Sequence, residues 1–362
     1  MPDLSGLSIC FIAGTLGQGG AERQLFYALK TLRQLDARVT LLSLTRDEFW
    51  EDRIRACGIP VKWVGRRKSR LARALQIVSE LRADPPDLIQ SQHFYTNLYA
   101  VAAARVSGRR EIGTLRSDTF SEVLSHALTG TLSLRAPRKI VANSRMAISN
   151  AISLGIPAER LYFLPTVVDS EMFRPLPKIS DGIVKLLAVG RLSPEKRFER
   201  FISIIASIKK QSSAKIKGIV VGDGPLRESL QQFSSEIGLD HDAIEFRGEV
   251  MEMASVYREA DILVLTSEFE GTPNVILEAM SSGLPVVSVK VGGVPEIVED
   301  QITGFLIEPY DELKMASAII QLIYKPDLRY GFGGAARRFI ELNRALNHLP
   351  QMLTDFYQAV LL

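Results

Sequence analysis

Short apolar runs that end in a small or polar residue, each followed by a stretch with helical spacing, recur along the sequence. Runs that alternate with helices in this way are typical of parallel strands in βα units. The predicted strands are 7–13, 39–44, 87–90, 111–115 and 139–143 in the first half and 184–189, 216–221, 244–247, 262–265 and 285–289 in the second, with a first helix over 21–35. The pattern therefore predicts an α/β protein with two Rossmann-like, doubly wound domains in tandem.

The length of the chain also favours two domains. A chain of 362 residues with 46% hydrophobic residues exceeds the size at which a single core usually keeps growing. Pro165, Pro175 and Pro177 lie in a stretch with little periodicity, so 164–181 is the predicted linker. The predicted parts are an N-terminal domain over 1–168, a C-terminal domain over 169–345 and a terminal helix over 346–362. We expect this helix to pack back on the N-terminal domain through an apolar stripe of Leu349, Met352, Leu353, Phe356, Tyr357 and Val360.

Cysteine content and hydropathy restrict the cellular setting. Cys10 and Cys57 are too few for a disulfide framework, and no run of about eighteen apolar residues could span a membrane. The positively charged leader of a secretory signal peptide is missing, because Asp3 precedes the first basic residue, Arg23. We therefore expect a cytoplasmic protein.

Charge is distributed unevenly between the two halves. Residues 1–168 contain 23 basic and 14 acidic side chains, a net charge of +9, whereas the remaining residues carry −6. Part of the positive charge is clustered at Arg66, Arg67, Lys68, Arg70 and Arg73, and again at Arg105, Arg109 and Arg110. Such a face can attract anionic lipid headgroups, which predicts peripheral contact with the inner face of the cell membrane; a solvated helix surface is the alternative. Nucleic acid is not an expected partner, because the basic residues are not interleaved with aromatic ones.

The stretch 266–280 carries the strongest chemical signal in the sequence. It follows the predicted strand 262–265 and so lies at the strand end where open parallel sheets bind ligands. Pro273 is suited to the first position of a helix. The amides that follow, at Asn274 and Val275, are then unpaired and can bind a phosphate group.

Two glutamates flank this helix start. Glu270 stands just before the helix, ahead of Gly271-Thr272-Pro273-Asn274, and Glu278 lies in its second turn. Carboxylates at both positions can accept hydrogen bonds from hydroxyls, which sugars and riboses offer. A single glutamate would be interpreted as a loop or helix-surface charge, but the pair behind a strand favours a ligand site.

The two glutamates, with seven residues between them, resemble the motif of glycosyltransferase family 4, a large group of retaining enzymes with the GT-B fold, and the resemblance extends across nearly the whole chain. It implies two Rossmann-like domains with a deep interdomain cleft, in which the N-terminal domain binds the acceptor and the C-terminal domain binds the nucleotide-sugar donor. It assigns Glu270 to the donor sugar and Glu278 to the nucleotide ribose. The other donor-binding positions that it implies here are Gly271, Thr272, Pro273, Asn274 and Val275.

A second loop of this kind is Val189-Gly190-Arg191-Leu192-Ser193-Pro194-Glu195-Lys196-Arg197. A departing nucleoside diphosphate accumulates negative charge, and the sequence shows no metal-ligand cluster to neutralise it. Arg191 offers a planar fork for two phosphate oxygens, and Lys196 offers a mobile point charge. The loop resembles the family's diphosphate-binding loop, so these residues are the predicted catalytic cations of a reaction without metal or cofactor; ion pairs with Glu195 or Glu199 are the alternative.

Two further loops of the second half are weaker candidates for donor binding. Gly222 and Gly224 follow a strand, where glycines permit close approach of the backbone to a ligand, although Gly-Asp-Gly is also an ordinary turn. Arg247 and Gly248 end the next strand, at the position where the family holds the base largely through main-chain contacts.

In the first half, the glycine-rich stretch 14–23 connects the first strand to the first helix. It lacks the Gly-x-Gly-x-x-Gly spacing of dinucleotide-binding proteins and resembles the family's loop near the donor phosphates, which makes Gly19 and Gly20 donor-binding candidates. A flexible turn is the alternative. His93 follows another strand, where the family often has a histidine near the transferred sugar. It is the predicted substrate-positioning residue in the catalytic set, and a structural histidine is the alternative.

One departure from the family pattern precedes the predicted linker. Where many members have Pro-Asn-Gly-Val-Asp, this chain has Pro165-Thr166-Val167-Val168-Asp169. A contact made by the family's Asn is therefore not carried over to this chain.

With the resemblance, these residues predict a retaining, metal-independent glycosyltransferase that moves a hexose from a UDP- or GDP-sugar to a glycan or lipid-linked acceptor, in polysaccharide or lipopolysaccharide assembly. No poised nucleophile is visible, so the leaving oxygen is expected to help deprotonate the acceptor hydroxyl on the same face. A nucleotide-sugar 2-epimerase of the same architecture and a non-catalytic nucleotide-sugar-binding protein are the alternatives. The absent fingerprint disfavours a dinucleotide-dependent oxidoreductase.

Overall fold

The computed structural model describes residues 4–67, 69–177 and 181–361, which form two compact units. The first unit comprises the described residues up to Thr166 together with those from Asn347 onward, and the second comprises the described part of Val167–Leu346. The predicted division, after residue 168, lies two residues beyond this one. Lys68, a member of the predicted basic cluster, lies outside the described residues.

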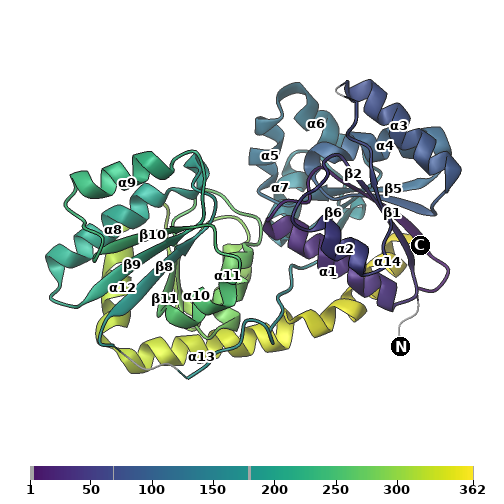
Figure 1. Ribbon diagram of the computed structural model, residues 1–362. Helices are drawn as coiled ribbons and strands as arrows, with labels where there is room; N and C mark the ends of the chain where they lie inside the picture. The colour runs from purple at the N-terminus through teal and green to yellow at the C-terminus, as the bar shows by residue number, and fades with distance from the viewer. Residues whose placement is uncertain (1–3, 68, 178–180, 362) are drawn as a thin grey trace. The chain divides into compact units, whose positions relative to one another are not determined.

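A parallel sheet forms the centre of the first unit (Figure 1). Its described strands are β1 (Ser8–Ala13), β2 (Arg38–Ser43), β3 (Val61–Trp63), β4 (Leu88–Ser91), β5 (Arg110–Leu115), β6 (Lys139–Ala142) and β7 (Leu161–Phe163). Their order is β3-β2-β1-β4-β5-β6-β7, and every neighbouring pair is parallel. The buried strand β1 pairs with β2 on one side and β4 on the other, so the direction in which the sheet grows reverses beside β1.

Helices pack on both faces of this sheet. They are α1 (Gly20–Gln34), α2 (Glu51–Ala56), α3 (Arg70–Ala83), α4 (Asn97–Ser107), α5 (Thr119–Ser125), α6 (Ala127–Arg135), α7 (Arg145–Ser153) and α14 (Leu349–Leu361), with the 3-10 turns η1 (Phe94–Thr96) and η2 (Ala158–Arg160). On one face, Ile12 and Ile89 pack against α3 and α4, and Ile140 packs against α7. The opposite face carries α1 and α14.

The terminal helix α14 is anchored to the first unit by polar contacts as well as by its apolar stripe. The hydroxyl of Tyr357 donates to Oε1 of Gln90 at 2.7 Å, and both side chains are almost completely buried. Arg110 and Lys139 donate to carbonyl oxygens in the last turn of the helix. Cations at this end oppose the negative pole of the helix dipole, so they stabilise the docked helix.

The second unit is built on another parallel sheet (Figure 1). Its described strands are β8 (Val184–Val189), β9 (Ile216–Val221), β10 (Ile244–Gly248), β11 (Ile262–Leu265), β12 (Val286–Val289) and β13 (Gly304–Ile307), in the order β10-β9-β8-β11-β12-β13. Its described helices are α8 (Phe198–Gln211), α9 (Arg227–Glu236), α10 (Met253–Glu259), α11 (Asn274–Ser281), α12 (Glu312–Tyr324) and α13 (Pro326–Asn343), with the turns η3 (Pro194–Lys196) and η4 (Val294–Glu296); a further turn, η5 (Leu346–His348), precedes α14. The two sheets and their helices establish the predicted α/β fold class.

Alternate residues of the second sheet fill two separate cores. Leu186 and Ala188 of β8 pack with α8 and α12 on one face, whereas Leu187 packs with α10, α11 and α13 on the other. Burial on both faces accounts for the nearly continuous apolar runs that identify these strands in the sequence. None of the helices formed by the described residues is long and apolar enough to cross a bilayer.

Three strands are absent from the sequence prediction. They are β3, β7 and β13, each only three or four residues long and each at the edge of a sheet. Every residue of β7 is only half-buried. A short edge strand buries little apolar surface, so it leaves no long hydrophobic run in the sequence.

The prediction of a linker over 164–181 is wrong for its central part. The N–H of Val168 donates to the carbonyl oxygen of Arg344 at 2.8 Å. Phe173 is 2% exposed, and its ring packs edge-on against Tyr257 with 5.7 Å between ring centroids. The prolines interrupt regular structure in this stretch, but Val167, Val168 and Phe173 between them are buried in the second unit. Residues 178–180 of the predicted linker lie outside the described residues.

We expect Tyr357→Phe to lower the stability of the first unit by about 1–3 kcal/mol, because the amide oxygen of Gln90 would lose its hydrogen bond while it stays buried. Tyr324→Phe is the matched control, since its hydroxyl bonds Ser212 at 2.8 Å on the exposed surface; its effect should stay below about 0.5 kcal/mol. Thermal unfolding of the full chain, followed by circular dichroism, measures both changes. Equal midpoints for Tyr357→Phe and the wild type would contradict this anchor.

Candidate functional site

The strand order of the second unit reverses beside β8. Strand β9 pairs with one side of β8 and β11 with the other, and the loops that follow β8 and β11 lead to helices on opposite faces. Ligands of open parallel sheets bind at such a reversal, outside the carboxyl ends of the strands. The two most informative sequence motifs, 189–197 and 266–280, follow these two strands.

Lys196 and Glu270 meet at this reversal. Nζ of Lys196 lies 2.6 Å from Oε1 of Glu270, and the two side chains are 26% and 10% exposed. A charge-assisted hydrogen bond of this length is strong, and partial burial weakens its screening by water. The structure therefore brings two predicted catalytic residues from separate loops into direct contact.

Further hydrogen bonds join the two loops that carry this pair. The hydroxyl of Thr266 lies within 3.1 Å of the carbonyl oxygens of Lys196 and Arg197. The N–H of Glu268 donates to the carbonyl oxygen of Glu195 at 2.8 Å. Arg197 has a φ of 53°, an uncommon value for a side-chain-bearing residue, and its guanidinium bonds Glu268 at 2.9 Å. The loop conformation that presents Lys196 is thus held by several independent contacts.

Helix α11 begins one residue later than predicted. Pro273 is its N-cap, with φ −72° and ψ 121°, and Asn274 is the first helical residue. The fixed φ of proline suits both positions, but its extended ψ here lets its carbonyl accept the N–H of Ile276 at 3.2 Å. The amides at Asn274 and Val275 still lie in the first turn, where the helix dipole favours an anion. Gly271 and Thr272 lie buried just before this turn.

Glu278 is buried in the second turn of α11 and accepts a hydrogen bond from the hydroxyl of Tyr257 at 2.9 Å. Tyr257 is completely buried on α10. A buried partner restricts the rotamers of the carboxylate and holds one of its oxygens in place. Sequence reasoning does not find Tyr257, because nothing in its surroundings marks it and it lies 21 residues before Glu278.

Arg191 differs from Lys196 in its surroundings. It is exposed and forms no ion pair with any described residue. Glu195 instead accepts a hydrogen bond from the hydroxyl of Ser193, and Glu199 pairs with Arg197. The alternative that Arg191 is an ordinary partner of these glutamates is therefore wrong, and its guanidinium is available to a ligand.

Gly222 and Gly224 serve the contact between two loops. Gly222 has a φ of +128°, and a Cβ atom on it would lie 2.0 Å from the carbonyl oxygen of Gly190. A Cβ atom on Gly224 would lie 2.6 Å from the carbonyl oxygen of Leu192. Only glycine permits this approach, so both residues set the path of the 190–192 loop that carries Arg191. Close approach to a ligand at these glycines stays a prediction.

Arg247 is bound by carboxylates of its own unit. Its guanidinium donates to Glu259 at 2.6 and 3.0 Å and to Glu245 at 2.9 and 3.3 Å. These bonds raise the pKa of Arg247, and the bond from Arg247 is the main reason that the pKa of Glu245 falls to about 2. The guanidinium is thus part of a structural cluster, and a ligand contact here is left to the main chain of Arg247 and Gly248.

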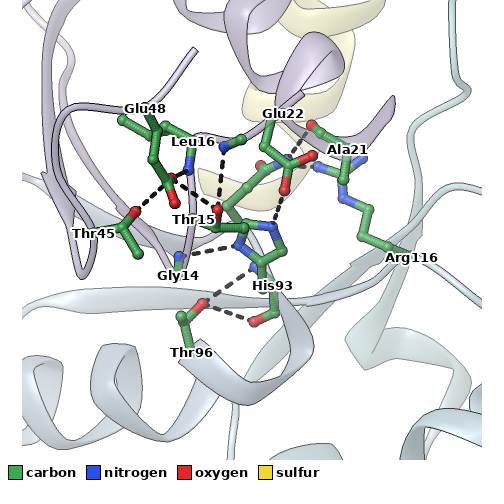
Figure 2. A network of polar contacts seen from close by, with 12 residues as sticks. Gly14, Thr15, Leu16, Ala21, Glu22, Thr45, Glu48, His93, Thr96 and Arg116 are labelled. Carbon is green, nitrogen blue, oxygen red and sulfur yellow. Dashed lines mark hydrogen bonds and ion pairs between the residues drawn. The ribbon is translucent and has the colours of Figure 1, made fainter. Parts of the chain in front are cut away.

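The first unit has a reversal of its own, between β1 and β4, where a polar network gathers (Figure 2). The N–H of Gly14, after β1, donates to Nδ1 of His93, after β4, at 3.1 Å. Nε2 of the same ring lies 2.8 Å from Oε1 of Glu22 on α1. The N–H of His93 donates to the hydroxyl of Thr96 at 3.2 Å. His93 therefore joins the two loops at the reversal and has protein partners at both ring nitrogens.

Glu22 lies over the N-terminus of its own helix. Gly19 is the N-cap of α1, without a side-chain cap, and Gly20 is the first helical residue. A Cβ atom on Gly19 would lie 2.1 Å from Oε2 of Glu22, so the glycine leaves room for the carboxylate. The helix dipole favours a negative charge at this place. The predicted Gly19 is therefore next to a carboxylate that sequence reasoning does not identify as a site residue.

Glu48 supports the glycine-rich loop from another side. It accepts hydrogen bonds from the hydroxyls of Thr15 and Thr45, at 2.8 and 2.6 Å, and from the N–H of Leu16 (Figure 2). Burial by itself would raise the pKa of Glu48, but these hydrogen bonds outweigh burial and hold the pKa below its ordinary value. The charged carboxylate of Glu48 thus holds the glycine-rich loop in place.

Arg116 extends the network from the end of β5. Its Nη2 donates to Oε1 of Gln92 at 3.2 Å, and Nε2 of Gln92 donates to the carbonyl oxygen of Ala21 at 2.8 Å. Glu122 accepts the N–H of Arg116 at 3.4 Å. Burial raises the pKa of Glu122 to about 8, although Arg116 acts in the opposite direction. The described residues of neither unit contain a group of three or more His, Cys, Asp or Glu side chains that could hold a metal ion.

Comparison with protein families identifies the chain. Residues 18–172 match the family described as Glycosyltransferase Family 4, and residues 184–325 match the family described as Glycosyl transferases group 1. The two matches together cover most of both units. The chain belongs to glycosyltransferase family 4.

Relatives of this family 4 member differ in their named activities. N-acetyl-alpha-D-glucosaminyl L-malate synthase of Bacillus anthracis is 28% identical over 249 residues, which cover 68% of this chain and 61% of that protein. A GDP-mannose-dependent alpha-(1-6)-phosphatidylinositol monomannoside mannosyltransferase of Mycobacterium tuberculosis is 28% identical over 219 residues, or 55% of this chain and 56% of that protein. The chain thus spans less than two thirds of the length of these relatives.

Solved structures establish that the family 4 chain has the GT-B fold. HepE of Anabaena, crystallised with UDP-glucose, has a TM-score of 0.85 and 21% identity, with 97% of this chain and 99% of HepE covered. Sucrose-phosphate synthase of Thermosynechococcus elongatus has a TM-score of 0.83 and 17% identity, with 98% and 99% covered. The likeness extends over both units of the chain.

Glu122 generates a testable pH dependence of stability. Its folded pKa, about 8, lies above the ordinary 4.5, so the folded state retains a proton that the unfolded state releases. Stability therefore falls as pH rises from about 4.5 to 8. Glu122→Gln removes this loss of stability. The melting temperature of the variant minus that of the wild type should therefore be larger at pH 8.5 than at pH 5 by about 2 °C or more. Melting curves at both pH values measure it, and a difference that does not change with pH would contradict the raised pKa.

Proposed function

We propose that this chain transfers a hexose-type sugar from a UDP- or GDP-linked donor to a hydroxyl of a glycan or lipid-linked acceptor. The reaction retains the anomeric configuration and needs no metal ion. Membership of glycosyltransferase family 4 and the GT-B fold support the transfer. The contact between Lys196 and Glu270 at the strand reversal is the observation that carries the proposal.

This contact supplies the two kinds of group that a nucleotide sugar requires. A diphosphate offers anionic oxygens to Lys196, and a sugar offers hydroxyls to Glu270. In the structure the two side chains bond to each other, so donor binding exchanges a bond within the protein for bonds to the ligand. Each side chain is already held close to its working position before the exchange, which reduces the entropy lost on binding.

The leaving group is stabilised by groups at the same edge of the sheet. Arg191 is exposed, Lys196 is next to Glu270, and the first turn of α11 directs its dipole outward. As the bond between sugar and diphosphate breaks, these groups compensate the charge that develops on the phosphate oxygens. The leaving oxygen then takes the proton of the acceptor hydroxyl, and the acceptor oxygen bonds to the anomeric carbon on the face that the diphosphate leaves, which retains the configuration.

The names of relatives leave the base of the donor open. One relative is named as GDP-mannose-dependent, and the HepE structure contains UDP-glucose. In this chain Glu278 is held by Tyr257 and would bind the ribose, which both nucleotides share. The main chain at Arg247 and Gly248 would contact the base, so no side chain at this position distinguishes uracil from guanine.

A surface of the first unit supports a lipid-linked acceptor in cell-surface polysaccharide or lipopolysaccharide assembly. No acidic residue lies between Asp52 and Glu80 in the sequence. Within this stretch Arg66, Arg67 and Arg70 are exposed, and Leu71 and Leu75 on adjoining turns of α3 are 71% and 62% exposed. Exposed leucines beside arginines match the apolar and anionic layers of a membrane surface, so we propose that α3 binds anionic lipid.

We expect UDP or GDP, with its sugar conjugates, to raise the melting temperature of the protein in EDTA; a ligand at 100 times its Kd adds about 2.7 kcal/mol. Lys196→Ala and Glu278→Ala should lose most of this shift, and Glu270→Ala and Lys196→Ala should lose sugar transfer while they keep the fold. Lys62→Ala is the control, because it breaks a Lys–Glu pair of 3.0 Å in the other unit.

Each outcome of this screen has a separate meaning. No shift with any nucleotide would contradict the donor site. A shift that requires added metal would contradict metal independence. A shift without transfer to any acceptor would favour the non-catalytic binding protein.

The α3 surface predicts binding to vesicles that contain anionic lipid. At low salt the wild type should cosediment with phosphatidylglycerol vesicles, and the doubly substituted Leu71→Ser, Leu75→Ser protein should bind at least about tenfold more weakly, because each leucine buries apolar surface in the lipid. Leu342→Ser is the matched control, since Leu342 is 74% exposed on α13 of the other unit. The proposal that α3 binds anionic lipid would be refuted if all three proteins sedimented equally, or if the wild type did not sediment with the vesicles.

A further inference from the structure

The Glu22–His93 pair is a largely buried ionisable pair of the network in the first unit. The side chains of His93 and Glu22 are 12% and 8% exposed. The ring of His93 also stacks on Tyr95, with 5.4 Å between ring centroids and 23° between their planes. Figure 2 shows the histidine between Gly14 on one side and Glu22 on the other. The imidazole is therefore held on its edges and on one of its faces.

The two contacts of the ring determine where its proton lies. The N–H of Gly14 donates to Nδ1, so Nδ1 has a lone pair and carries no hydrogen. The proton of the imidazole is then on Nε2, which points at the carboxylate of Glu22, 2.8 Å away. The bond thus runs from Nε2–H to Oε1, and His93 has no ring nitrogen left to accept a proton from a substrate hydroxyl.

Glu22 is itself fixed by the element on which it lies. It occupies the first turn of α1, where the helix dipole stabilises a carboxylate. The main chain of this turn is tied to the sheet, because Gln92 donates to the carbonyl oxygen of Ala21 at 2.8 Å. The main chain that carries Glu22 is therefore held independently of His93.

We propose that Glu22 is a positioning residue for His93, and that a hydroxyl of the transferred sugar exchanges into their bond, where it accepts Nε2–H and donates to the carboxylate of Glu22. A hydroxyl both donates and accepts, so it satisfies both groups, whereas an ether or a carbonyl oxygen that took Nε2–H would give the carboxylate no donor in return. The role in transfer rests on the proposed function. It makes His93 a hydrogen-bond donor in the reaction and excludes it as the general base.

The positioning can be tested without substrate by NMR of the full chain labelled with ¹⁵N-histidine. The protein contains 4 histidines, so His93→Asn assigns the signal of His93 by its loss. In the wild type at pH 7.5 we expect an unprotonated Nδ1 and a protonated Nε2 whose hydrogen exchanges slowly with water. Glu22→Gln should keep this signal, because the amide oxygen still accepts Nε2–H, and Glu22→Ala should lose it.

Glu51→Gln provides the matched control. Glu51 is also a buried glutamate in the first turn of a helix of this unit, but its carboxylate bonds Arg55 and the N–H of Asp47. Its replacement should leave the His93 signal unchanged. An unchanged signal in Glu22→Ala, or a protonated Nδ1 in the wild type, would overturn the proposal. If Glu22→Ala does not fold, loss of the slowly exchanging signal in folded Glu22→Gln overturns it instead.

Kinetics then test the consequence for transfer. We expect Glu22→Ala to lower kcat/KM for the donor by about tenfold or more and Glu22→Gln to lower it by less than about threefold, since the hydrogen bond to a charged partner is worth this much. Equal losses of kcat/KM in the two variants would refute the idea that the side-chain oxygen of residue 22 positions His93 by accepting its Nε2–H. A wild type that shows the expected histidine signal but transfers no sugar would refute the proposed function alone and leave the Glu22–His93 geometry established.

Discussion

The reversal of strand order beside β1 and beside β8 is the constraint on which the rest of each unit depends. At each reversal the helices that follow the two neighbouring strands pack on opposite faces of the sheet. The loops at the carboxyl edge therefore diverge, and backbone groups there are left without strand partners. Side chains make the connection instead. In the second unit Lys196 bonds Glu270 and Thr266 bonds the opposite main chain. In the first unit His93 joins Gly14 to Glu22. The groups that hold the loops together thus include residues that the sequence predicts to contact a ligand.

Two carboxylates of these sites, one half-buried and one buried, accept hydrogen bonds from the protein. Glu48 accepts three hydrogen bonds, and Glu278 is held by a tyrosine. An unpaired carboxylate in the same places would be costly, since a buried charge without a partner destabilises the fold by several kcal/mol. Such pairing has a functional effect. A ligand that enters exchanges one hydrogen bond for another, so only a group that can replace the lost partner binds well, and selectivity arises from chemistry rather than from shape alone.

How much of this could be predicted from the sequence depended on burial and on distance along the chain. Strands β8, β9 and β11 are predicted with their observed bounds, because both of their faces are buried and their apolar runs are continuous. Strands β3, β7 and β13 are not, because edge strands bury little. The Glu270 and Glu278 pair lies within one βα unit and is therefore visible as a motif. Tyr257, Glu48 and Glu22 contact residues far away in the sequence, so no local motif marks their contacts. Only Glu22 has a recognisable sequence setting, as an acidic residue in the first turn of a helix that a glycine caps.

The two networks differ in net charge, so each by itself suits a different kind of ligand group. Lys196 with Glu270 is neutral as a pair, and the exposed Arg191 in the same loop as Lys196 adds a positive charge, so this edge can accept a diphosphate. The Glu22–His93 pair is negative when Nδ1 carries no hydrogen, and its carboxylate covers the N-terminus of α1, which would otherwise attract a phosphate. A diphosphate at Gly19 and Gly20 would meet this carboxylate and be repelled unless Glu22 moved away. Hydroxyls meet no such repulsion. The electrostatics therefore favour phosphate recognition by the second unit and hydroxyl recognition by the first.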